Sequence, residues 1–188
     1  MARPSLTKLA YYTLQQGKTL AGIAHKEIST KLMEVISPEA TPKKFPINKE
    51  LIREVRKSMA NLERIDWEEA EEGIYPKSQL FEAPWFEWFK KYPLLWFDMP
   101  LTWERRKMKK TREIPKNINQ DEYPNYYLQN FHHQTDGYLS EHSAEIYDIQ
   151  VEILFNGTAD SMRRRILAPL KRGLKKYITN DKKKAKVL

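Results

Sequence analysis

The chain has 188 residues, 40% of them hydrophobic, which suffices for a domain with its own core, and no apolar run is long enough to span a membrane. It has no cysteine, which excludes disulfides, thiol catalysis and cysteine-bound metal. Because its N-terminus also lacks the apolar core of a secretion signal, we expect a cytoplasmic protein. The formal net charge of +8 lies almost entirely in residues 171–188; because nucleic-acid binders usually spread such charge over a face, we expect no nucleic-acid partner.

Residues 1–37 are predicted to form an N-terminal amphipathic helix. Leu6, Leu20 and Ile28 belong to a set of apolar residues that recurs at helical spacing along this segment. Because lysines are interspersed among them, the helix also suits an anionic membrane surface. We favour a surface helix packed on its own domain and keep peripheral membrane contact as the alternative.

Residues 38–120 are predicted to form a helical, aromatic- and proline-rich region with linkers. Three prolines between positions 38 and 46 exclude a continuous helix there, and Asn48 is a good N-cap for a second helix. A dense aromatic block follows between Phe81 and Trp103, and its prolines favour short helices and turns. We expect the aromatic side chains to pack in the core, with a partner protein or a lipid interface as the alternatives.

Residues 121–173 are predicted to form a helical segment that contributes to a pocket. Ser140 is a suitable N-cap for a helix that Asn156 and Gly157 end. This helix is apolar on two faces, as expected for a helix buried between layers. Thr158 is suited to cap the helix that follows.

Residues 174–188 are predicted to form a basic linker and the beginning of a β-strand. The stretch 184–188 (KAKVL) resembles the opening of a buried strand, and no other convincing strand pattern occurs in the sequence. Because a single strand has no hydrogen-bonding partner, we expect the natural protein to continue beyond it. The expected fold class is therefore mainly α.

Side chains that suit a small-molecule pocket are concentrated between positions 126 and 136. His132 and Asp136 are the candidate catalytic residues, because histidine titrates near neutral pH and a carboxylate can accept a proton. The plainer interpretation is that His132 satisfies buried backbone groups and that Asp136 belongs to a tight turn. No metal site is expected, because further ligands at a compatible spacing are missing. The candidate pocket residues are Tyr126, Tyr127, Phe131, His132, Gln134, Thr135, Asp136 and Arg163.

Four motifs in this part of the chain together resemble one known family. They are Tyr-Pro-x-Tyr-Tyr at 123–127, Phe-His-x-Gln-Thr-Asp-Gly-Tyr-Leu-Ser at 131–140, Ser-Ala-x-x-Tyr-Asp-x-Gln-Val-Glu at 143–152 and Gly-Thr-Ala-Asp-x-Met-Arg-Arg at 157–164. The combination resembles the region before the S-adenosylmethionine (SAM) domain in class I methyltransferases of a cyanobacterial and plastid type, which are distantly related to quinone-biosynthesis C-methyltransferases. The resemblance is strong here and weak in the preceding helices.

The resemblance implies a helical N-terminal cap region of an α/β, Rossmann-like methyltransferase, ending at the first strand of the sheet. The glycine-rich GxGxG loop that would hold the cofactor, SAM, does not occur in this sequence, so the implied SAM domain is missing and the chain alone is expected to be inactive. The implied partners are that C-terminal domain and a small-molecule methyl acceptor, with His132, Gln134 and Asp136 lining the cleft. The alternative is a non-enzymatic helical adaptor that binds a protein partner or an anionic membrane surface.

Overall fold

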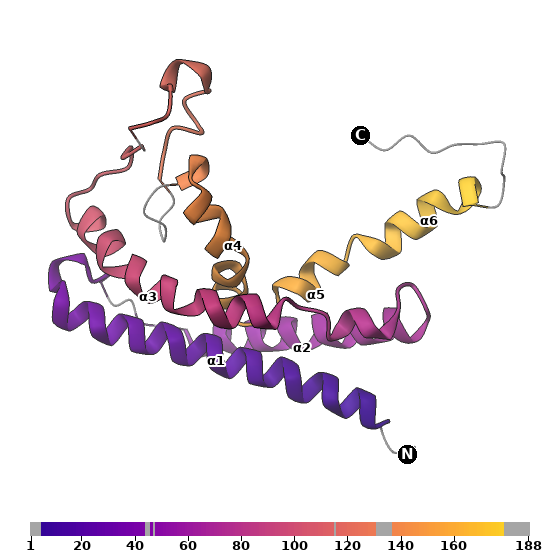
Figure 1. Cartoon of the computed structure of the whole chain (residues 1–188). Helices are drawn as coiled ribbons and strands as arrows, with labels where there is room; N and C mark the ends of the chain where they lie inside the picture. Colours follow the sequence, from indigo (N-terminus) through magenta and orange to yellow (C-terminus); the bar gives the residue numbers. More distant parts are fainter. Residues whose placement is uncertain (1–4, 44–45, 47, 115, 131–136, 179–188) are drawn as a thin grey trace. The chain divides into compact units, whose positions relative to one another are not determined.

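The computed structural model of the chain is built from helices (Figure 1). It describes residues 5–43, 46, 48–114, 116–130 and 137–178. No strand occurs within these residues, which confirms the mainly α fold class, and the strand predicted at 184–188 lies outside them. The α-helices are α1 (Leu6–Ile36), α2 (Lys49–Glu71), α3 (Trp85–Lys107), α4 (Glu141–Leu154), α5 (Ala159–Arg164) and α6 (Leu167–Ile178). The short 3-10 helices are η1 (Pro38–Ala40), η2 (Lys77–Leu80), η3 (Gln120–Glu122) and η4 (Gly137–Leu139).

The chain divides into two compact units, each assembled from segments that are distant in the sequence. Unit 1 collects the described parts of 1–19, 47–83 and 157–188, and unit 2 collects those of 20–46 and 84–156. Helix α1 therefore contributes its first part to unit 1 and its remainder to unit 2. Within each unit, helices far apart in the chain bury each other's apolar faces.

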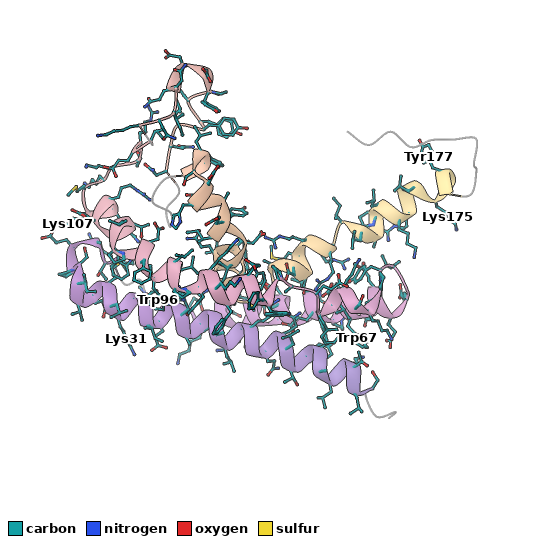
Figure 2. All side chains as sticks on the ribbon, viewed as in Figure 1. Lys31, Trp67, Trp96, Lys107, Lys175 and Tyr177 are labelled. Atoms are coloured by element: carbon teal, nitrogen blue, oxygen red, sulfur yellow. The ribbon has the colours of Figure 1, made fainter. Side chains whose placement is uncertain are left out.

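Unit 1 has an aromatic core. Tyr11 of α1 and Trp67 of α2 are fully buried, and their ring centroids lie 5.9 Å apart (Figure 2 labels Trp67). Tyr75 and Leu80 complete the buried cluster, and Leu167 of α6 packs against it. Large aromatic side chains contribute much of the burial energy of a small unit, so this cluster brings α1, α2 and α6 together.

Unit 2 is held by two apolar clusters. Helix α3 packs against α4 through Leu95, Ile146 and Ile149. Met33 of α1 packs with Trp103 of α3 in the second cluster. The first cluster confirms that one face of α4 is buried, whereas its other apolar face, with Tyr147 and Leu154, is exposed.

Helix α3 is one continuous helix of 23 residues, although Pro93 and Pro100 lie inside it. The prediction of short helices and turns is therefore wrong here. An internal proline costs about 3 kcal/mol, and the burial of Leu95 and Trp103 along the same helix offsets that cost. Core packing accounts for only part of the aromatic block, because three phenylalanines of α3 remain exposed. They are Phe86, Phe89 and Phe97.

The helix ends follow the sequence closely. Asn48 caps α2 by accepting a hydrogen bond from Glu50 N at 2.8 Å, and Ser140 caps α4 through Ser143 N at 3.2 Å, both as predicted. Thr158 precedes α5 as predicted, but its hydroxyl lies 3.9 Å from the sulfur of Met162 instead of capping the helix.

Gly157 is required where α4 ends and unit 1 resumes. Its φ is +82°, which favours glycine. A Cβ at this position would lie 2.4 Å from the Cβ of Lys18 on α1, closer than any real side chain allows. Both the backbone conformation and the approach of α1 therefore depend on this glycine.

Candidate functional site

The predicted pocket residues fall into three groups. Those from Phe131 to Asp136, which include His132, Gln134 and Thr135, lie outside the described residues, so their roles stay predictions. Tyr126 and Tyr127 belong to unit 2, and Arg163 belongs to unit 1.

Tyr126 and Tyr127 form an aromatic cluster with Tyr138. The ring centroids of Tyr126 and Tyr127 are 4.1 Å apart, and those of Tyr127 and Tyr138 are 5.7 Å apart at nearly a right angle. A hydrogen bond with the hydroxyl of Tyr127 raises the pKa of Tyr126. The cluster ties residues before position 131 to the 3-10 helix η4, so it flanks the segment in which the candidate catalytic residues lie.

The three consecutive arginines at 163–165 point to different partners, as expected for neighbours on a helix. Arg163 is exposed and donates to Asp160 Oδ1 at 3.0 Å within its own helix. Arg165 donates to Glu69 Oε1 of α2 at 2.6 Å. The middle residue, Arg164, is the one that reaches a buried group.

That group is Asp66 of α2, the centre of a buried polar network in unit 1. Arg164 donates through Nε to Asp66 Oδ1 at 2.8 Å and through Nη2 to Oδ2 at 2.7 Å. The hydroxyl of Tyr75 donates to Oδ1 at 2.7 Å, and the hydroxyls of Tyr11 and Ser161 donate to Oδ2 at 2.7 and 2.9 Å. This site cannot be recognised in the sequence, because its members are spread over 153 positions and only the fold brings them together.

The charges of the network stabilise one another. Burial alone would raise the pKa of Asp66, but the Arg164 guanidinium and the hydroxyls of Tyr75 and Tyr11 outweigh it and hold the pKa below its usual range. Burial and the adjacent carboxylate raise the pKa of both tyrosines. A carboxylate that already accepts five hydrogen bonds has no free lone pair for a substrate proton, so the network is structural.

A cavity of about 470 Å³ lies in unit 2 and is the best candidate for a binding site. Helix α1 contributes lining side chains from positions 25–33, α3 from 95–106 and α4 from 147–154. Its size lies within the usual range for small-molecule sites, and its lining is mostly apolar. The principal apolar residues are Met33, Leu95, Met99, Trp103, Val151 and Leu154.

His25 lines this cavity in an aromatic setting. Its Nδ1 is 3.0 Å from the hydroxyl of Tyr92, and its ring centroid is 4.8 Å from that of Trp96 (Figure 2 labels Trp96). Burial, reinforced by the neighbouring charge of Lys26, lowers the pKa of His25, so its ring is neutral near neutral pH. The neutral imidazole of His25 therefore forms part of the cavity wall and adds no charge to it.

Neither Tyr126 nor Tyr127 lines this cavity. The cavity residues were missed in the sequence because each appears there as ordinary helix material: a histidine and a lysine on α1, methionines and a tryptophan on α3. Among the described residues, no group of three or more His, Cys, Asp or Glu side chains is placed to hold a metal ion.

Comparison of the chain with protein-family models, with curated proteins and with solved structures finds no match. In the described ranges, no helix combines the length and the apolar character that crossing a membrane requires.

Proposed function

We propose that this chain is the helical, acceptor-binding part of a SAM-dependent methyltransferase, and that unit 2 binds an apolar small molecule in its cavity. The observation that carries the proposal is the cavity of about 470 Å³ between α1, α3 and α4. Apolar walls with a few polar groups are typical of sites that bury most of a small ligand.

The methyl-transfer part of the proposal is supported by the four motifs between positions 123 and 164. Methyl transfer from SAM needs mainly the alignment of donor and acceptor, so a helical region that holds the acceptor suits that chemistry. SAM itself would bind to a glycine-rich loop on a separate α/β domain, with His132 and Asp136 facing the acceptor. These residue roles are part of the proposal.

Two experiments test the proposal. Titration calorimetry with small apolar ligands should detect binding to the purified chain, and Met99→Trp, which fills the cavity from α3, should abolish it while Phe97→Trp on the exposed face of α3 should not. Reading the gene past the codon for Leu188 should reveal a GxGxG-containing segment. A stop codon there, with no methyltransferase gene nearby, would contradict the methyltransferase assignment.

A second candidate function is that of an adaptor for an anionic membrane surface. It is favoured by the exposed phenylalanines Phe86 and Phe89 at the beginning of α3, where the Lys90 ammonium lies 4.1 Å from the ring centroid of Phe86. Aromatic rings beside lysines suit a lipid headgroup region. Sedimentation with anionic vesicles should show binding that weakens with salt and is lost in Phe86→Ser/Phe89→Ser; no sedimentation at low salt would exclude this function.

A further inference from the structure

The charged lining of the unit 2 cavity has a single sign. Lys26 of α1 and Arg106 of α3 both line it, and among the residues that the structure describes no aspartate or glutamate does. The rest of its described lining is mostly apolar, so the cavity combines an environment for a hydrocarbon body with two positive charges. Such a cavity should bind apolar ligands that carry a negative charge in preference to those that are neutral or positively charged.

The serine and threonine hydroxyls of the lining already donate within their own helices. Ser29 and Thr30 donate to the carbonyl oxygen of Lys26 at 3.1 and 2.7 Å. Thr102 donates to the carbonyl oxygen of Met99 at 2.7 Å. Because these hydroxyl hydrogens are used within the helices, the charged donors available to a ligand are the lysine and the arginine.

Lys26 is the more strongly desolvated of these two cations. Its side chain is half-buried, its Nζ lies 3.3 Å from the carbonyl oxygen of Leu154 at the end of α4, and burial lowers its pKa. In the part of the chain that the structure describes, no carboxylate pairs with it, whereas Lys31 one turn later pairs with Glu27 at 3.1 Å. An anion placed beside a half-buried ammonium gains more than one beside the exposed Arg106.

The lining of the cavity extends along α3 from Leu95 to Arg106, a rise of about 17 Å, and the two cations lie at different levels along the helices. His25, next to Lys26, contacts Trp96, and Met33 packs with Trp103, so α1 and α3 run in the same direction along the cavity. From Lys26 to Met33 the helix rises about 10 Å. Arg106 lies one turn beyond Trp103. A ligand with a charged group at the Lys26 end would therefore have an apolar body along the helices.

We propose that the ligand of the unit 2 cavity is an elongated apolar molecule with one carboxylate, which the Lys26 ammonium binds beside the C-terminal end of α4. The inference rests on the proposed binding of a small apolar molecule by unit 2 and adds the charge and the orientation of that molecule. One carboxylate oxygen accepts from Nζ, and one of the other two Nζ hydrogens stays on the Leu154 carbonyl.

The test uses three ligands with the same alkyl chain and different head groups, namely decanoate, decanol and decylammonium. Calorimetric titration of the full chain at neutral pH should show that decanoate binds with roughly tenfold higher affinity than decanol, which is the effect of one charge-assisted hydrogen bond. Decylammonium should bind with the lowest affinity of the three. The variants are Lys26→Met, Lys26→Arg and the control Lys31→Met, whose side chain projects from α1 into solvent (Figure 2).

Lys26→Met should bind decanoate and decanol equally, to within about twofold, while Lys26→Arg and Lys31→Met keep the preference for decanoate. Equal binding of decanoate and decanol by the unchanged protein would overturn the inference and leave the proposed cavity function standing. Loss of the preference in both Lys26 variants, or a preference for decylammonium, would also overturn it. If none of the three ligands binds, both the inference and the proposed function fail.

Discussion

Arg164 of α5 and Asp66 of α2 form a two-pronged ion pair, with donor–acceptor distances of 2.8 and 2.7 Å, although 98 positions separate them in the chain. Asp66 is fully buried, and its carboxylate also receives the hydroxyls of Tyr11, Tyr75 and Ser161. The Asp66 carboxylate therefore joins three separate parts of the sequence. Removing its ion pair should lower the stability of unit 1 as a whole.

Replacing Arg164 with Met should destabilise unit 1 by about 3–5 kcal/mol, because the buried Asp66 carboxylate would lose its counter-charge. The measurement is urea unfolding followed by tryptophan fluorescence, to which Trp67 in the same core contributes. The matched control is Arg53→Met on α2, whose pair with Glu50 at 3.1 Å is exposed and should contribute less than about 1 kcal/mol. Similar losses of unfolding free energy in the two variants would show that the buried pair contributes no more stability than the exposed one.

The same pair predicts how stability depends on acid. Because the folded-state pKa of Asp66 lies below its unfolded value, its contribution is fully present above about pH 5 and is lost as the pH falls through the folded-state pKa. The urea midpoint should therefore decline on acidification, and Asp66→Asn should decline less steeply from a lower starting point. Parallel pH profiles for the two proteins would contradict this assignment.

At the alkaline end the tyrosines act in the opposite sense. The pKa values of Tyr11 and Tyr75 are raised in the folded state, so their contribution is present below the unfolded value of about 10 and is lost as the pH rises toward the folded values. Tyr75→Phe should make the urea midpoint less sensitive to pH above about 10, with Tyr123→Phe on an exposed ring as the control. An unchanged alkaline profile in Tyr75→Phe would contradict the prediction.

Two glycine substitutions should change stability in opposite directions. Gly157→Ala should destabilise the protein by more than about 1 kcal/mol, because φ is +82° and the new Cβ would collide with Lys18. Gly17→Ala, in the exposed middle of α1 with no atom near the new Cβ, should stabilise it by about 1 kcal/mol. Thermal unfolding by circular dichroism measures both. A stabilising Gly157→Ala would show that α1 does not approach this position.

Gln15 offers a test of a buried amide. Its side chain is 1% exposed, and neither its oxygen nor its nitrogen has a hydrogen-bond partner among the described residues. Gln15→Met keeps the shape and removes the desolvated amide, so it should leave stability unchanged or raise it by about 1 kcal/mol. The exposed neighbour Gln16→Met is the control and should have almost no effect. A marked loss of stability in Gln15→Met alone would show that the amide binds a group essential to the fold.

The local structure of this protein could largely be predicted from its sequence. The caps at Asn48 and Ser140 and the end at Gly157 follow from side-chain and backbone chemistry within a few residues. Helix α3 could not be predicted in the same way, because local rules stop a helix at Pro93 and only the packing of Leu95 shows why it continues.

The candidate sites depended still more on the fold. Asp66 belongs to an acidic stretch that resembles a solvated helix face. Only its ion pair with Arg164 in the folded structure shows that it is buried. The cavity is formed by side chains whose types are common in any helix, so its position and its positive charge follow from the packing of α1, α3 and α4. The sequence motifs instead directed attention to positions 131–136, which the structure does not describe.

The way in which unit 1 is assembled has a consequence for synthesis on the ribosome. Its core and the Asp66 network need residues from α1 and from α5, which leave the ribosome at widely separated times during translation. All of unit 2 lies between them in the chain, so its helices emerge earlier and can pack first. Tyr11 can therefore complete its contacts only after α5, which carries Ser161 and Arg164, has been made.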